Sequence, residues 1–173
     1  MSRRRLSPAQ FNKIMGNSTD EQIEERQRRL FGDADCRRQV AALPWRRTGD
    51  VSEFMLITSR DTGRWVLPKG WIEKNEKPWR AAEREAEEEA GLRGNISRYD
   101  LGRYFYAKVQ RIGPAIPCEV AIFPLEVTKV SDKWREKGVR VRRWFSAADA
   151  ASLVEEPDLS ALIRRFAERQ HSR

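Results

Sequence analysis

One helical segment, from Pro78 to Ala90, constrains this chain more than any other feature. Proline suits the first turn of a helix, and Gly91 suits the position just after its end. At 100° per residue, aromatic and small side chains share one narrow face: Trp79, Ala82, Ala86 and Ala90. A face of this kind can lie close against a sheet, so we expect this helix to be buried on one side.

Three carboxylates flank that face of the helix. Glu85, Glu88 and Glu89 stand at i, i+3 and i+4 and share an arc of about 100°. Like charges at these spacings destabilise a helix by about 0.2–0.5 kcal/mol per pair. A divalent cation between them reverses the effect, because Mg²⁺ prefers oxygen ligands and completes its shell with water and substrate phosphates. A solvated acidic face is the competing interpretation.

Composition limits the class of protein and of partner. The chain has 173 residues, which predicts one domain with a core of its own. The 39% hydrophobic share includes six Trp and seven Phe and so argues against disorder. Lys and Arg total 34 against 26 Asp and Glu, a net charge of +8. This excess favours polyanions such as nucleic acid, nucleotide or inositol phosphates, or an acidic membrane surface, although a basic surface can also serve solubility alone.

Several classes of site and location are excluded. Cys36 and Cys118 make no disulfide framework and no cysteine zinc site. The single histidine, His171, is two residues from the end, which argues against a histidine-centred triad or metal site. The sequence has no run of 18 apolar residues, and no continuous apolar segment follows the Ser-Arg-Arg-Arg of residues 2–5. We therefore expect no membrane partner, no signal peptide and a cytoplasmic location.

The remaining pattern mixes strands and helices, which predicts an α/β layered domain. Strand-like segments are expected at Gln39–Trp45, Val51–Thr58, Arg64–Leu67, Tyr99–Val109, Glu119–Val127 and Arg140–Phe145. Short helices are expected after Ser146 and from Asp158. A capping box of Ser18 and Glu21 predicts an N-terminal helix ending at Gly32. Residues 1–35 thus form a basic arm and helix, and residues 36–173 the main domain.

The residues around the helix fit a known motif. Gly70 is followed after five residues by Glu76, and after seven more by Arg84 and the segment EAEEEAGL. This stretch matches the Nudix box, GX5EX7REUXEEXGU, at every fixed position, and the chain resembles the Nudix hydrolase family. The resemblance implies a Nudix-type α/β/α sandwich around a mixed sheet, here with an extra N-terminal helix. It also implies hydrolysis of a substituted diphosphate by water, with Mg²⁺ or Mn²⁺.

Roles follow from the resemblance, residue by residue. Glu85, Glu88 and Glu89 match the family's metal-binding and base-bearing glutamates, and the carbonyl of Lys69 would also contact metal. The general base is expected at Glu88, with Glu89 as the alternative. The resemblance gives three further residues supporting roles. Arg84 would orient the glutamates, Glu76 would brace the loop, and Gly70 would allow a tight turn.

Further residues resemble the diphosphoinositol polyphosphate phosphohydrolase branch, whose members also cleave diadenosine polyphosphates. The expected substrate-binding residues are Arg37, Arg38, Thr58, Ser59, Arg60, Lys69, Gly70, Lys108, Arg111 and Arg140. Strand alternation puts Arg140 and Arg142 on one side, which we expect to face substrate, and Val141 and Arg143 on the other.

Other functions stay open at this point. Two alternatives within the family are removal of pyrophosphate from RNA 5′ ends and hydrolysis of unwanted nucleotides. RNA is not favoured, because no aromatic stacking signature accompanies the basic residues 3–5. A non-catalytic Nudix-shaped binding or regulatory module, and a general nucleic-acid-binding protein, are further alternatives. The oligomeric state is open, with a homodimer among the options.

Overall fold

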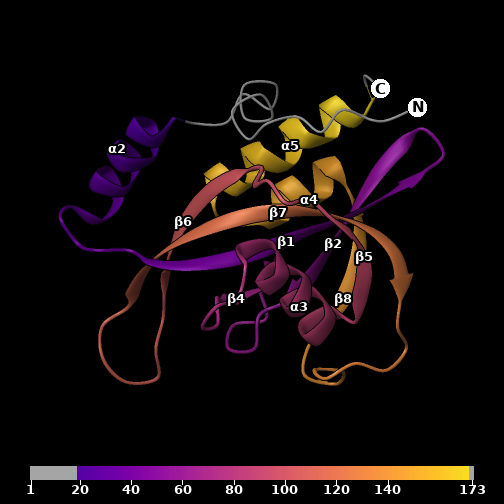
Figure 1. Ribbon diagram of the computed structural model, residues 1–173, viewed down its shortest axis with the longest axis horizontal. Coiled ribbons are helices and arrows are strands. Elements are labelled where there is room, and N and C mark those ends of the chain that lie inside the picture. Colours follow the sequence, from indigo (N-terminus) through magenta and orange to yellow (C-terminus); the bar gives the residue numbers. More distant parts are fainter. Residues whose placement is uncertain (1–18, 172–173) are drawn as a thin grey trace.

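The computed structural model describes residues 19–171, which are built around one mixed sheet of eight strands (Figure 1). The strands are β1 (Arg37–Thr48), β2 (Val51–Thr58), β3 (Trp65–Val66), β4 (Lys69–Trp71), β5 (Leu92–Ile96), β6 (Gly102–Lys108), β7 (Ile116–Val130) and β8 (Arg142–Ser146). β1 pairs in parallel with β7 and antiparallel with β2 and β4. β5 and β6 pair with β7, whereas β3 and β8 pair with β2.

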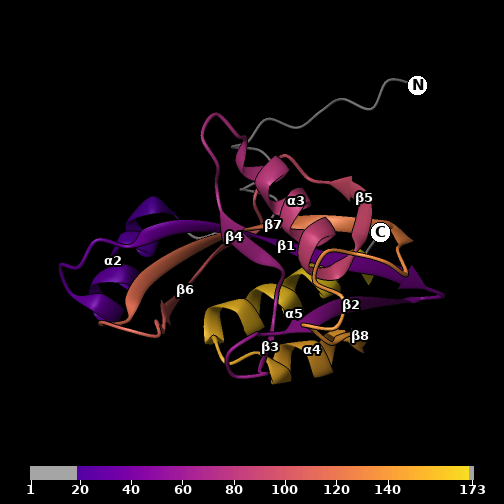
Figure 2. The same ribbon diagram turned by 90° about the horizontal axis from the view of Figure 1, so that it is seen from below.

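Helices cover both faces of this sheet, as the two perpendicular views show (Figures 1 and 2). The helices are α2 (Asp20–Phe31), α3 (Pro78–Ala90), α4 (Ala147–Leu153) and α5 (Pro157–His171). One hydrophobic cluster joins α3 to the sheet, and the other joins α4 and α5 to it. The expected α/β/α sandwich is confirmed. None of the helices in the described part of the chain is long and apolar enough to cross a bilayer.

α3 has the bounds and the buried face that its sequence predicts. Ala82, Ala86 and Ala90 are fully buried, as is Ala81, and these small side chains allow a close approach to β1. Gly91 ends the helix at φ 65°, in the left-handed conformation, which glycine adopts without steric cost. The helix is therefore fixed against the sheet along the side that carries its carboxylates.

α2 is the extra N-terminal helix, and it lies to one side of the sheet, near β6 (Figure 1). Its capping box is formed by Thr19 and Gln22, not by Ser18 and Glu21; Ser18 lies outside the described residues. The helix buries no side chain completely. The ion pair of Arg26 with Asp158, at 2.9 Å, joins it to the start of α5.

Strand pairing moves several of the predicted boundaries. β1 continues to Thr48, because Arg46 bonds Glu53 across the hairpin at 2.8 Å and leaves only Gly49 and Asp50 in the turn. β4 and β5 were not predicted, since both are short and depend on distant partners.

The last strand and helix also begin at other residues than expected. β8 starts at Arg142, which pairs with Ile57 of β2, and Arg140 lies before the strand with its side chain bound to Glu136 and Glu89. α5 starts at Pro157, so Asp158 lies in the first turn and is not the N-cap. The carboxylate of Asp158 pairs with Arg26 of α2.

Gly94 gives a test of the sheet's packing. It follows a register shift in the pairing of β5 with β7, and a Cβ there would collide with the carbonyl of Glu126, 2.8 Å from its carbon. We expect Gly94→Ala to lower the free energy of unfolding by about 2–3 kcal/mol, measured by urea denaturation. Gly49→Ala is the control: its φ is +61° but the space is open, so the cost should be about 1 kcal/mol. Equal losses in the two variants would contradict this account.

Candidate active site

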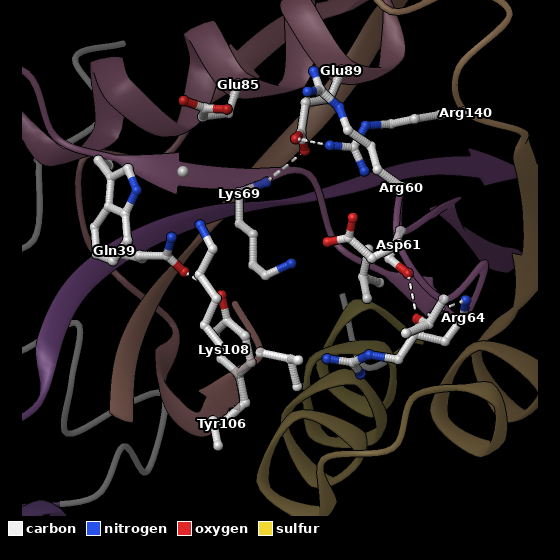
Figure 3. A pocket seen from close by; sticks show the side chains of 17 residues that line it. Gln39, Arg60, Asp61, Arg64, Lys69, Glu85, Glu89, Tyr106, Lys108 and Arg140 are labelled. Carbon is white, nitrogen blue, oxygen red and sulfur yellow. Dashed lines mark hydrogen bonds and ion pairs between the residues drawn. The ribbon is translucent and has the colours of Figure 1, made fainter. Parts of the chain in front are cut away.

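A cavity of about 470 Å³, here called the central pocket, opens beside α3 (Figure 3). Its walls come from α3, β4, β6, the β2–β3 loop and the segment before β8. Eight of the seventeen lining residues are charged: Arg60, Arg64, Lys69, Lys108 and Arg140 are cationic, and Asp61, Glu85 and Glu89 are acidic. The surplus of positive charge favours a ligand with several negative charges.

Glu85 and Glu89 project from α3 toward this pocket (Figure 3). They are only 9% and 8% exposed, and burial raises the pKa of both carboxyl groups. Arg84 opposes that shift at Glu85, and Arg140 opposes it at Glu89. The pair thus forms an acidic wall in which each carboxylate is buried beside an arginine.

Gly70 makes room for this acidic wall. It lies in β4, and a Cβ at this position would overlap Oε1 of Glu85 and lie 2.7 Å from Oε2. Glycine is therefore required at this position because the backbone lies against the carboxylate of Glu85. The resemblance implied a tight turn instead, but Gly70 pairs with Val40 of β1 as part of a strand.

Arg84 connects the carboxylates of α3 to the preceding loop. Its guanidinium donates to Glu85 at 2.6 Å, to both carboxylate oxygens of Glu76 at 3.0 Å, and to the carbonyl of Trp71 at 3.0 Å. The carboxylate of Glu76 also accepts a hydrogen bond from the backbone N–H of Glu73 at 3.0 Å. These contacts suit the orienting and bracing roles that the resemblance implies.

Glu88 does not line the central pocket, although Arg84 links it to Glu85: Nη1 of Arg84 lies 2.6 Å from Glu85 and 4.0 Å from Glu88. It lines a different cavity, on the outer side of α3, and pairs with Arg135 at 2.8 Å. Its side chain is 31% exposed. The structure therefore brings Glu85 and Glu89 together at the central pocket but leaves Glu88 outside it.

Glu136 is a buried carboxylate that the sequence analysis missed. It accepts hydrogen bonds from the guanidinium groups of both Arg60 and Arg140, and both arginines line the central pocket. Arg140 also donates to Glu89, and to the carbonyl of Thr58 at 3.0 Å. The only sequence signal was an acidic residue four positions before Arg140 in a basic segment.

Lys69 contributes two different groups. Its backbone N–H donates to Glu89 at 3.0 Å, and its ammonium lies 5.2 Å from the ring centre of Tyr106. Burial lowers the pKa of Lys69 to about 8, with Glu89 acting in the opposite direction. Tyr106 in turn donates to Gln39 at 2.6 Å, and these two pocket residues were not predicted.

Four of the expected substrate-binding residues lie away from the lining of the pocket. The hydroxyl of Thr58 accepts a hydrogen bond from the N–H of Val141 at 2.9 Å, and Thr58 does not line the pocket. Arg37 stacks on Trp71, with its guanidinium carbon 4.2 Å from the ring centre. The other two are exposed and do not line the pocket: Arg38 and Arg111. Ser59, Arg60, Lys69, Gly70, Lys108 and Arg140 do line it.

Arg142 does not face the pocket, although strand alternation grouped it with Arg140. Its guanidinium donates to the carbonyls of Ala90 and Ser131 and stacks on Trp134, with 3.8 Å between the guanidinium carbon and the ring centre. Alternation fails here because Arg140 precedes the paired strand.

The acidic wall fits a hard divalent cation. Carboxylate oxygens are the ligands that Mg²⁺ and Mn²⁺ prefer, and a cation would offset the cost of two buried like charges. Within residues 19–171, no group of three or more His, Cys, Asp or Glu side chains is arranged to hold a metal ion. The two glutamates would therefore share the cation with backbone, water or substrate oxygens, as is usual for Mg²⁺.

Comparison with known proteins gives consistent results. The NUDIX domain family model matches residues 36–168. The chain is 28% identical over 131 residues to diphosphoinositol polyphosphate phosphohydrolase 3-beta of Bos taurus, covering 75% of this chain and 76% of that protein. It is 32% identical over 123 residues to Nudix hydrolase 16, mitochondrial, of Arabidopsis thaliana, covering 69% and 68%.

A solved structure agrees on the fold. The Ap4A hydrolase of C. elegans superposes with a TM-score of 0.56 at 19% sequence identity, covering 78% of this chain and 98% of that one. The family match covers most of the chain, from residue 36 to residue 168. The chain belongs to the Nudix hydrolase family and is a pyrophosphohydrolase related to the diphosphoinositol polyphosphate phosphohydrolases.

Proposed function

We propose that this protein hydrolyses a pyrophosphate linkage in a highly phosphorylated small molecule, either a diphosphoinositol polyphosphate or a diadenosine polyphosphate. One observation carries the proposal: Glu85 and Glu89 form an acidic wall in a pocket that is otherwise rich in Lys and Arg. A polyanion can bind the cationic side chains while its diphosphate reaches the carboxylates. The named activity of the bovine relative agrees with this substrate class.

The carboxylates of Glu85 and Glu89 are the proposed holders of Mg²⁺ or Mn²⁺, with Glu88 and the Lys69 carbonyl as further ligands suggested by the resemblance. When bound, such a cation neutralises phosphate charge and acidifies water. Nudix hydrolases generally use divalent metals. The acidic wall gives this chain donors of the appropriate kind.

The other pocket residues bind and orient the substrate. Arg60 and Arg140 bring guanidinium groups to the pocket; both are held by Glu136, and their remaining N–H groups can donate to phosphate oxygens. Lys108 adds a third cation at the opposite wall (Figure 3). The attacking water must lose a proton to a carboxylate in the pocket. We assign that proton to Glu89, reversing the preference for Glu88, because Glu89 lines the pocket and Glu88 pairs with Arg135 outside it.

Three expectations remain proposals. They are the cytoplasmic location, the division of the chain near residue 35, and the absence of RNA as the main substrate. The basic residues 3–5 that favour RNA lie outside the described part of the chain.

A substrate and metal panel tests the proposed function. Phosphate release should appear with a diphosphoinositol polyphosphate or diadenosine polyphosphate in the presence of Mg²⁺ or Mn²⁺, because the pocket's surplus charge suits these ligands. Removal of divalent cations with EDTA should abolish release, and added metal should restore it. Nucleotide sugars, dNTPs and 5′-triphosphate RNA are the comparison substrates. No release from any substrate would favour a binding module, whereas release from RNA alone would favour the RNA alternative.

Amide variants of the box glutamates test the assignment of the proton acceptor. We expect Glu89→Gln to lower kcat by at least about 10²-fold, and Glu88→Gln to have a smaller effect. Glu83→Gln is the matched control, because Glu83 lies on the same helix and pairs with Arg80 on the surface at 2.6 Å. A larger loss in Glu88→Gln than in Glu89→Gln would return the assignment to Glu88.

Glu136 is expected to act as a positioning residue for Arg60 and Arg140. The change Glu136→Gln keeps its shape but removes the charge that holds both guanidinium groups, so KM should rise about fivefold with a smaller change in kcat. Glu53→Gln is the control, since Glu53 binds Arg46 at the hairpin instead. A loss of thermal stability with unchanged KM would show that Glu136 is only structural.

A further inference from the structure

A second cavity, of about 430 Å³, adjoins the central pocket and is here called the side pocket. The two cavities share part of their lining: Thr62, Arg64, Tyr106, Ala107 and Val109. The two cavities therefore lie next to each other, on either side of these residues.

The side pocket is built partly from elements that the family domain does not include. α2 contributes Arg26 and Leu30, and α2 precedes the matched range of residues 36–168. The turn between α4 and α5 forms the opposite wall. The ion pair of Arg26 with Asp158, at 2.9 Å, connects these two walls.

The charge of the side pocket differs from that of the central pocket. Three carboxylates line it against two guanidinium groups, and both guanidinium groups are already paired. Arg26 binds Asp158, and Arg64 binds Glu156 at 2.8 Å. The lining therefore carries one more negative than positive charge, in contrast to the central pocket, so the side pocket disfavours anions.

Apolar surface is the second feature of the side pocket. Leu30 and Val109 are 45% and 74% exposed, although both are large hydrophobic residues. Tyr106 and Pro157 extend this surface, to which Phe105, only 6% exposed, adds little. A flat neutral ligand would remove it from water, at a gain of roughly 25 cal/mol per Å² of apolar area.

One carboxylate in the side pocket is well placed for a hydrogen-bond donor. The side chain of Glu155 is 69% exposed and lies 3.7 Å from Arg64, so it keeps acceptor capacity toward the cavity. An exocyclic amino group on an aromatic ring can donate to such a carboxylate. Apolar walls and an acidic acceptor together are a suitable site for an amino-bearing nucleobase.

We propose that the side pocket receives the nucleobase of a substrate whose diphosphate occupies the central pocket. This inference rests on the proposed function and chooses between its two substrate classes. A dinucleoside polyphosphate has a neutral ring at its end, whereas a diphosphoinositol polyphosphate presents phosphates around its whole ring. The side pocket fits the first and repels the second.

Leu30 provides the test, because it lines the side pocket and not the central pocket. We expect Leu30→Glu to raise KM for diadenosine polyphosphate about fivefold with kcat nearly unchanged. Leu30→Ala should change KM in the same direction by a smaller factor, without adding charge. Val51→Glu is the matched control, since Val51 is 53% exposed and lies at the β1–β2 hairpin. Circular dichroism and thermal melting check that each variant folds.

Two outcomes would overturn the inference. The first is an equal rise in KM for diadenosine polyphosphate and for diphosphoinositol polyphosphate in Leu30→Glu, since this would reflect general electrostatics. The second is an unchanged KM for diadenosine polyphosphate in both Leu30 variants.

A binding measurement separates this inference from the proposed function. In the wild-type protein, AMP should bind about fivefold tighter than ribose 5-phosphate, and Leu30→Glu should remove that difference. Equal binding of the two ligands to the wild-type protein would overturn the inference even if hydrolysis is observed. If no substrate is hydrolysed but AMP binds preferentially, the proposed function fails and the side pocket stands.

Discussion

The burial of two like charges on one helix is the constraint on which the rest of the site depends. Glu85 and Glu89 are almost removed from water, and burying an ionised carboxylate costs several kcal/mol unless it is paired and hydrogen-bonded. Arg84 and Arg140 supply the pairing. Arg84 also binds Glu76, and Arg140 also binds Glu136, so acidic and basic side chains alternate along each chain of contacts.

This alternation connects parts of the chain that are far apart in sequence. Glu76 holds Arg84 from the loop before α3, and Glu136 holds Arg140 from the segment before β8. The acidic wall is thereby fixed from two sides, while the small residues of α3 and Gly70 of β4 set how closely the helix approaches the sheet. A change in any of these contacts would move a carboxylate, even where the changed residue does not face the pocket.

The features that could be predicted from sequence are those that local physics determines. α3 has the predicted bounds because a proline, an alanine stripe and a C-terminal glycine act within a few residues of one another. The matching of the box residues also predicted Glu85, Glu89 and Arg84. β4, with three residues, has no local signal, since only its pairing with β1 defines it. Glu136 and Tyr106 depend on tertiary contacts in the same way.

The net charge of +8 indicated a polyanionic partner but not where such a partner would bind. The structure distributes that charge unevenly between two adjoining cavities. The central pocket holds more cationic than acidic side chains, whereas in the side pocket carboxylates outnumber guanidinium groups. A ligand with charge on every side can match only one of these environments. A ligand with an anionic middle and a neutral end matches both. The arrangement of the protein's charges therefore carries more information about the substrate than its net charge does.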